Sequence, residues 1–178
     1  MPILARVARI SSVAALAEKV SEIADSGPTT IVQDDSFFRC ETGRLKLRRF
    51  SDDSGELIYY RRPDRQAPKE SFYLRSPTTE PLAMIESLTL AYRKRGRIKK
   101  RRTLFLVGRT RVHLDVVEQL GDFLELEVVL EKSEPPESGI HETRQLMHRL
   151  GIQRAQLVEG AYIDLLEEDV ESLLKTVS

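Results

Sequence analysis

Charged residues recur at every second position in several strand-like runs of this sequence. Within each run the charged residues share one parity: Arg109, Arg111, His113 and Asp115 in one run, Glu125 and Glu127 in the next, and Arg44, Lys46 and Arg48 far upstream. Because successive side chains of a strand point to opposite faces, each run gathers its charges on one face and places residues such as Leu124, Leu126 and Val128 on the other. Cations dominate three runs and carboxylates the fourth, and that combination suits a phosphate group with its divalent metal ion.

The basic run before these strands fits the alternation less cleanly. Lys100 and Arg102 share parity with Leu104 and Leu106, so this strand either bulges or passes from a polar to an apolar environment along one face. Residues 93–97 would look the same in a solvated charge run or a nuclear-targeting patch. Several neighbouring strands with charges on one parity form either the exposed face of an antiparallel sheet or the polar lumen of a closed barrel, and the pattern alone does not separate the two.

Length and composition narrow the class of protein. The 178 residues fit a single domain, and the net charge of zero provides no overall field that would attract nucleic acid, which is not an expected partner. The single Cys40 cannot form an internal disulfide and fits a reducing compartment. We find no apolar run long enough for a membrane span and no signal-peptide pattern, so the sequence predicts a cytoplasmic protein without a membrane partner.

The local patterns predict an α+β protein. Strands are expected at 3–10, 29–40, 44–50, 57–62 and 70–75 and in the charged segment 98–130, with a turn at 51–55 and loops at 64–68 and 131–139. A first helix should begin after Ser11 and Ser12 as candidate caps, with Val13, Leu16, Ala17, Val20 and Ile23 on its apolar face. Further helices are expected at 81–92, at 140–150 with Gly151 as the stop, and at about 161–177.

Five segments together resemble a known family. They read GRLKLR (43–48), LIYYRRPD (57–64), IKKRRTLFL (98–106), RVHLDVVEQLGDFLELEV (111–128) and GAYIDLL (160–166). This order is similar to the CYTH superfamily, the triphosphate tunnel metalloenzymes, which include class IV adenylate cyclases, thiamine triphosphatases and inorganic triphosphatases. The resemblance implies that residues 1–178 form one CYTH-like domain, an eight-stranded antiparallel β-barrel with flanking helices, whose tunnel holds a triphosphate.

The resemblance also implies roles for individual residues. Phosphate oxygens would be bound by Lys46, Arg48, Arg61, Lys100, Arg102 and Arg111, since guanidinium and ammonium groups suit phosphate. Asp115, Glu125 and Glu127 would hold Mg²⁺ or Mn²⁺, whose hard character favours carboxylate oxygens. Two alternatives stay open: Glu127 could pair with a tunnel arginine, and His113 fits a hydrogen-bonding wall residue better than a catalyst. No residue is assigned a catalytic role.

The first strand departs from the family pattern. Members begin with E-x-E-x-K, which supplies two metal-binding carboxylates and a phosphate-binding lysine, whereas this chain reads MPILARV and has no carboxylate before Glu18. If the segment ARV keeps the family register, Leu4 replaces the lysine and Pro2 replaces the second glutamate. Catalysis with two metals is therefore not expected, although one metal could be held by Glu125, Glu127 and oxygens of the substrate.

Several functional hypotheses follow. The first is a tunnel that binds a triphosphate, a nucleotide or another phosphorylated small molecule, with metal-dependent triphosphatase or adenylate-cyclase chemistry weakened or altered by the lost motif. The second is a fully active enzyme of that kind, because phosphoryl transfer depends mainly on charge placement. The third is an anion sensor or interaction protein without catalysis, and a narrower one is a diphosphate enzyme with Leu4 and Tyr59 or Tyr60 as apolar wall. A homodimer is left open, with the acidic C-terminal helix as one element that could mediate it.

Overall fold

A computed structural model of the chain describes residues 3–61 and 72–177. Within these residues the strands are β1 (Ile3–Ile10), β2 (Ser26–Phe38), β3 (Arg44–Arg49), β4 (Gly55–Arg61), β5 (Phe72–Thr78), β6 (Lys94–Val107), β7 (Thr110–Val117), β8 (Gly121–Val129) and β9 (Leu157–Val158). The helices are α1 (Val13–Ser21), α2 (Pro81–Tyr92), α3 (Pro136–Leu150) and α4 (Tyr162–Val177), with a 3-10 turn at Arg154–Gln156. The loop predicted at 64–68 and the start of the strand predicted at 70–75 lie outside the described residues.

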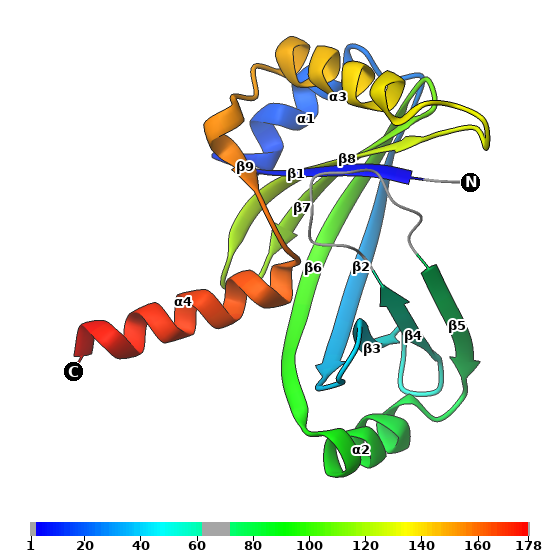
Figure 1. Cartoon of the computed structure of the whole chain (residues 1–178), viewed down its shortest axis with the longest axis vertical. Coiled ribbons are helices and arrows are strands. Elements are labelled where there is room, and N and C mark those ends of the chain that lie inside the picture. The colour runs from blue at the N-terminus through cyan, green and yellow to red at the C-terminus, as the bar shows by residue number, and fades with distance from the viewer. Residues whose placement is uncertain (1–2, 62–71, 178) are drawn as a thin grey trace.

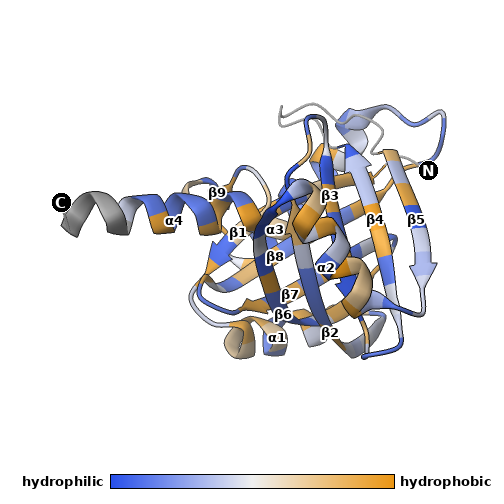
Figure 2. Cartoon of the chain, turned by 90° about the horizontal axis from the view of Figure 1, so that it is seen from below, coloured by the Kyte–Doolittle hydropathy of each residue, from blue (hydrophilic) through white to orange (hydrophobic). Residues whose placement is uncertain are grey.

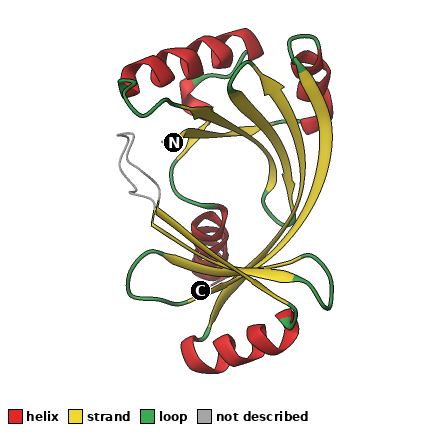
Figure 3. Ribbon diagram, turned by 90° about the vertical axis from the view of Figure 1, so that its right-hand side faces the viewer, coloured by secondary structure: helices red, strands yellow, loops and turns green. Residues whose placement is uncertain are grey.

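The strands form one antiparallel sheet in the order β5-β4-β3-β2-β6-β7-β8-β1-β9. The sheet is strongly curved and has a concave inner face (Figure 3). The α+β class is as predicted, but the described sheet has nine strands and not eight. The additional strand arises because the chain after α3 returns to pair Leu157 and Val158 with β1. Within the described residues no strand pairing joins β5 to β9, the two ends of this order.

The convex face of the sheet is covered by α1 and α3 (Figure 1). Its core consists of apolar side chains from both helices and from β1, β6, β7 and β8: Ile10, Leu16, Val20, Phe105, Val112, Leu114, Leu124, Leu126, Leu146, Met147 and Leu150. Ser12 caps α1 as predicted, because its hydroxyl accepts a hydrogen bond from the amide of Ala15 at 3.2 Å. Residues far apart in sequence therefore hold the strands that carry the charges in a fixed position.

The alternation predicted for β7 and β8 is present in the structure. Leu124, Leu126 and Val128 are buried on the convex side, while Glu125 and Glu127 lie on the concave side. Figure 2 shows the resulting bands of hydrophilic and hydrophobic residues alternating along the strands. The single sheet thus separates an apolar core from a face that carries charged side chains.

The register of β6 resolves the parity question at Lys100 and Arg102. β6 pairs with β7 without a shift, so that Arg102 is opposite Asp115 and Leu104 is opposite His113. The concave face of β6 therefore changes from polar at Arg102 to apolar at Leu104 along one continuous strand. The register between β2 and β6 shifts at two other places, between Ser26 and Thr29 of β2 and between Gly96 and Lys94 at the start of β6, and neither shift lies at Lys100 or Arg102.

The register of β1 differs from the one predicted. Leu4 is 3% exposed and packs with Val128 and Leu130 on the convex side, so it does not occupy the lysine position of the family motif. The concave side of β1 carries Ala5, which is paired with Glu127, and Val7, which is paired with Glu125. The ARV segment alone could not fix this register, because the face of a strand is decided by its cross-strand partners. Pro2 lies outside the described residues.

α4 begins against the sheet and then extends away from it (Figure 1). Its first turns contact β6, where a side-chain methyl group of Ile163 reaches Gly96 and leaves no room for a Cβ atom. The range predicted for the C-terminal helix, about 161–177, agrees with α4. In the described part of the chain, no helix combines the length and the apolar character that crossing a membrane requires.

Candidate functional site

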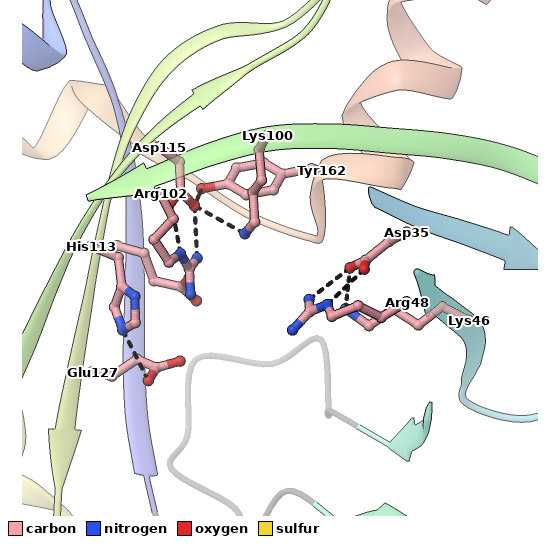
Figure 4. A network of polar contacts seen from close by, with 10 residues as sticks. Asp35, Lys46, Arg48, Lys100, Arg102, His113, Asp115, Glu127 and Tyr162 are labelled. Atoms are coloured by element: carbon pink, nitrogen blue, oxygen red, sulfur yellow. Dashed lines mark hydrogen bonds and ion pairs between the residues drawn. The ribbon is translucent and has the colours of Figure 1, made fainter. Parts of the chain in front are cut away.

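A cavity of about 190 Å³ lies on the concave face of the sheet. Its lining includes five cationic side chains. Lys46 and Arg48 of β3 and Lys100 and Arg102 of β6 are mostly buried, whereas the fifth, Arg75 of β5, is 60% exposed and lies 3.9 Å from Glu56. Carboxylates of β2 and β8 and the start of α4 complete the polar part of the wall. Figure 4 shows these side chains in two groups that approach the cavity from different strands. We call this space the central cavity.

The first group is organised by Asp35 on β2. Its carboxylate accepts a hydrogen bond from the Lys46 ammonium at 2.6 Å and two from the Arg48 guanidinium at 2.7 and 2.8 Å. β3 pairs directly with β2, and this pairing brings the two cations onto one carboxylate. Burial opposes the charged form of Asp35, but the ion pairs with Lys46 and Arg48 outweigh it and lower the pKa of Asp35 to about 2.

Lys46 is the most strongly perturbed cation of the first group. Burial lowers the pKa of Lys46 to about 8, against the attraction of Asp35, and repulsion from Arg48 and Lys100 adds to this effect. Its ammonium also lies 5.5 Å from the centre of the Phe37 ring and 5.7 Å from that of Tyr60. The charge of Lys46 is therefore sensitive to any anion that enters the cavity.

The second group is organised by Asp115 on β7. This fully buried carboxylate accepts hydrogen bonds from Lys100 at 3.0 Å, from Arg102 at 2.7 Å through two nitrogens, and from the Tyr162 hydroxyl at 2.9 Å. Arg102 also donates to Glu125 at 2.6 Å. Burial opposes the charge of Asp115, yet its cationic partners hold the pKa of this carboxyl well below its usual range. Asp115 thus positions the Arg102 guanidinium at the cavity wall.

Glu127 belongs to a third, smaller contact on β7 and β8. Its carboxylate is 3.2 Å from the His113 ring and 3.6 Å from the Arg111 guanidinium. Burial favours the neutral acid, but the hydrogen bond to His113 together with the positive charges of His113, Arg102 and Arg111 outweighs it and lowers the pKa of Glu127 to about 2. Arg111 is 47% exposed and lies at the margin of this group. His113 is buried beside this carboxylate but is not among the residues that line the central cavity, and its predicted role as a wall residue stays a prediction.

The predicted site residues fall into three sets. Six of them line the central cavity: Lys46, Arg48, Lys100, Arg102, Glu125 and Glu127. Asp115 lies behind the wall and Arg111 at its margin. Arg61 is not brought into this group, because it shares the parity of Tyr59 on β4 and donates a hydrogen bond to the Tyr59 hydroxyl at 2.8 Å. Tyr60 and not Tyr59 faces the cavity. The phosphate-binding and metal-binding roles stay predictions.

Two residues that organise the site were missed from the sequence. Asp35 has the parity of Gln33 and Phe37, which also line the cavity, but it follows Asp34 directly and no pattern says which of the two faces inward. Tyr162 comes from α4, far along the chain, and its ring lies 4.8 Å from the Lys100 ammonium. The segment GAYIDLL was the only signal, and it indicated a resemblance rather than a contact.

Comparison with protein families places the chain. The family model described as CYTH domain matches residues 7–162. The chain belongs to the CYTH domain family. The match begins at Val7, after the stretch in which E-x-E-x-K would be expected, and it includes all strands that contribute cations to the central cavity.

Relatives of this CYTH protein extend the comparison. Adenylate cyclase CyaB of Aeromonas hydrophila is 34% identical over 82 residues, which are 46% of this chain and 43% of that protein. The match thus spans less than half the length of the curated relative. The PH1012 protein from Pyrococcus horikoshii has a TM-score of 0.79 at 24% identity and covers 93% of this chain and 99% of that one. A Hippeastrum protein described as an adenylyl cyclase with a dominant triphosphatase activity has a TM-score of 0.56 at 18% identity, over 85% and 89% of the two chains. At these identities the structural matches show the fold alone.

CYTH enzymes typically use divalent metal ions, and the residues of this chain can be tested for such a site. No three His, Cys, Asp or Glu side chains within residues 3–61 and 72–177 are arranged to hold a metal ion. Asp115 is occupied by Lys100, Arg102 and Tyr162, and on β1 the cavity face carries Ala5 and Val7 in place of carboxylates. The donor set of the described residues does not fit a protein-bound divalent metal.

Proposed function

We propose that the central cavity binds the phosphate chain of a small molecule and that protein cations, rather than a resident metal, neutralise its charge. The observation that carries this proposal is the convergence of Lys46, Arg48, Lys100 and Arg102 from β3 and β6 on one cavity of the concave face. Guanidinium groups bind carboxylate and phosphate oxygens with the same paired geometry, so phosphate oxygens are natural substitutes for the carboxylates that hold these cations now.

The size of the cavity supports a compact ligand. Its volume of about 190 Å³ is below the roughly 300 Å³ at which pockets for drug-sized molecules begin. A chain of two or three phosphates combines small volume with high charge, whereas a large organic group would have to extend past the cavity. In this proposal the curved sheet forms the tunnel implied by the family resemblance, with the phosphates between β3 and β6 and any organic part near Tyr60 and Tyr73.

The chemistry expected of such a site is weak phosphohydrolase or cyclase activity. Phosphoryl transfer relies on positioning and on cations that stabilise the charge of the transferring group, and metal ions normally bridge the phosphates. Here the cations would position the phosphates and stabilise part of their charge. The described residues offer no group of three side chains that could hold a metal ion. We therefore expect this protein to bind phosphate chains readily and to hydrolyse or cyclise them slowly.

The test is isothermal titration of the protein with inorganic tripolyphosphate, ATP and pyrophosphate, first in EDTA and then with Mg²⁺ or Mn²⁺. We expect binding in EDTA that changes little when metal is added. Absence of binding under all conditions would overturn the proposal and favour an interaction protein. Binding that requires metal, or phosphate or cyclic AMP released at ordinary enzymatic rates, would instead support a metal bridged by Glu125, Glu127 and substrate oxygens.

A variant of β1 tests the metal argument separately. Ile3→Glu with Ala5→Glu adds two carboxylates on the face that carries Glu127 and Glu125. We expect this variant to gain affinity for Mn²⁺, measured by calorimetry or by the enhanced relaxation rate of water protons. The matched control is Arg6→Glu, because Arg6 points to the other face of the same strand. Equal Mn²⁺ binding in both variants would show that the assigned register is wrong.

A further inference from the structure

Helix α2 is apolar on all sides and yet exposed. Its sequence, PLAMIESLTLAY, contains three polar residues, Glu86, Ser87 and Thr89. Of all twelve residues of this helix, Pro81 alone is buried. Leu82, Leu90 and Tyr92 are 49%, 81% and 52% exposed. A helix that is hydrophobic all round is normally buried inside a protein or an interface. Figure 1 shows α2 at the periphery of the molecule, where it packs against β2 and β3.

The exposed face of α2 has two parallel rows of side chains. One row is Leu82, Glu86 and Leu90, and the other is Ala83, Ser87 and Ala91, each spaced by four residues. Side chains four apart lie above one another on a helix surface, so a row of large residues runs beside a row of small ones. Such a surface allows a second helix to approach closely, with its large side chains in the groove above the small ones.

We propose that this face binds the same face of a second copy of the chain, with the two α2 helices antiparallel about a twofold axis. A twofold axis between Glu86 and Ser87 sets Leu82 against Ala91 of the other copy and Leu90 against Ala83. Large apolar residues then meet small ones on both sides of the axis, and at the axis Glu86 lies against Ser87 of the other copy. Because the arrangement is symmetric, each contact occurs twice, as an isologous interface requires.

The charges at the ends of α2 support a second copy as the occupant. Glu80 precedes the helix and Arg93 follows it, and both are exposed. In the antiparallel arrangement Glu80 of one copy meets Arg93 of the other at both ends of the contact, and the two helix dipoles also oppose each other. The net charge of zero means that two copies do not repel each other as a whole. A parallel arrangement would place like charges together.

The contact should give a dimer of modest affinity. One helix of 12 residues is shorter than the recognition surface of a standard interface, which involves about 20–30 residues on each side. We therefore expect a monomer–dimer equilibrium that depends on protein concentration.

Sedimentation velocity over a range of concentrations tests the proposal. Leu90→Glu should raise the dimer dissociation constant by about tenfold or more, because a charge replaces a central apolar contact. The control is Val170→Glu, which changes a half-exposed apolar residue on α4 and should leave the equilibrium unchanged. Far-ultraviolet circular dichroism shows that both variants are folded. A protein that stays monomeric at every concentration, or a dimer that tolerates Leu90→Glu, overturns the proposal.

A charge exchange tests the antiparallel orientation. Glu80→Arg and Arg93→Glu should each weaken the dimer, and the double variant should restore it, because each pair then has opposite charges again. Additive weakening in the double variant would refute this pairing. A monomer whose α2 instead binds vesicles of anionic lipid, lost in Leu90→Glu, would overturn the dimer in favour of a membrane surface. None of these outcomes depends on phosphate binding in the central cavity.

Discussion

Replacement of Asp35 by asparagine tests whether the central cavity is neutralised by its own carboxylates. Asp35 is 3% exposed and is the shared acceptor of Lys46 and Arg48. Asparagine keeps the shape of the side chain but removes its charge, so two partly buried cations lose their common counterion. Without Asp35 the cavity carries an excess of positive charge that an incoming anion, or loss of a proton from Lys46, can compensate.

The size of the effect follows from the burial of the partners. Removal of one member of a buried ion pair costs about 3–5 kcal/mol. The side chains of Lys46 and Arg48 are 14% and 16% exposed, which lets water reach them and favours the lower end, about 3 kcal/mol. For a domain of this size about 1 kcal/mol shifts the Tm by roughly 2–4 °C, so Asp35→Asn should lower the Tm by about 6–12 °C.

Thermal unfolding with and without tripolyphosphate, in EDTA, measures this effect. The ligand should raise the Tm of Asp35→Asn more than that of the original protein, because the anion replaces the lost carboxylate. The matched control is Asp34→Asn, whose carboxylate binds the exposed Arg97 and Arg49 on the other face and should contribute no more than about 1 kcal/mol. Equal losses in the two variants, or an equal response to the ligand, would refute the reasoning.

Three further predictions concern other groups of the central cavity. Tripolyphosphate affinity should fall as the pH rises through about 8, because a bound anion raises the pKa of Lys46 and binding then requires proton uptake; titration at several pH values should show this slope, and Lys46→Arg should abolish it. Arg102→Ala should weaken binding by about 1.5–3 kcal/mol in calorimetry, whereas Arg101→Ala, on the opposite face, should have little effect. Tyr162→Phe removes one hydrogen bond to Asp115 and should lower the free energy of unfolding in urea by about 1 kcal/mol; a change below a few tenths would contradict this role.

The secondary structure was largely predictable from local patterns. β1 and α2 have the predicted bounds, and the alternation in β8 correctly separated Leu124 and Leu126 from Glu125 and Glu127. These patterns are short-ranged, because they depend on side chains of one element facing one core. For the same reason α3 was predicted four residues too short: its first turn begins at Pro136 within a stretch whose composition is typical of a loop.

The composition of the site was less predictable, because it depends on contacts between strands. The register of β1 follows from its pairing with β8, which buries Leu4 and turns Ala5 inward, and no local pattern in MPILARV contains that information. Arg61 resembles a phosphate ligand in sequence, but its parity on β4 places it beside Tyr59. Asp35 is one of two adjacent aspartates, and only the pairing of β2 with β3 and β6 selects it for the cavity.

The internal carboxylates explain how a cationic cavity can exist without ligand. The four mostly buried cations around this cavity would repel each other strongly, and Asp35 and Asp115 reduce this cost by holding two cations each. A ligand must then compete with these carboxylates instead of filling an unpaired site. In the proposed phosphate complex, a chain of phosphates that contacts both groups would gain from linking the two binding events. A single phosphate that displaces one carboxylate would lack this gain.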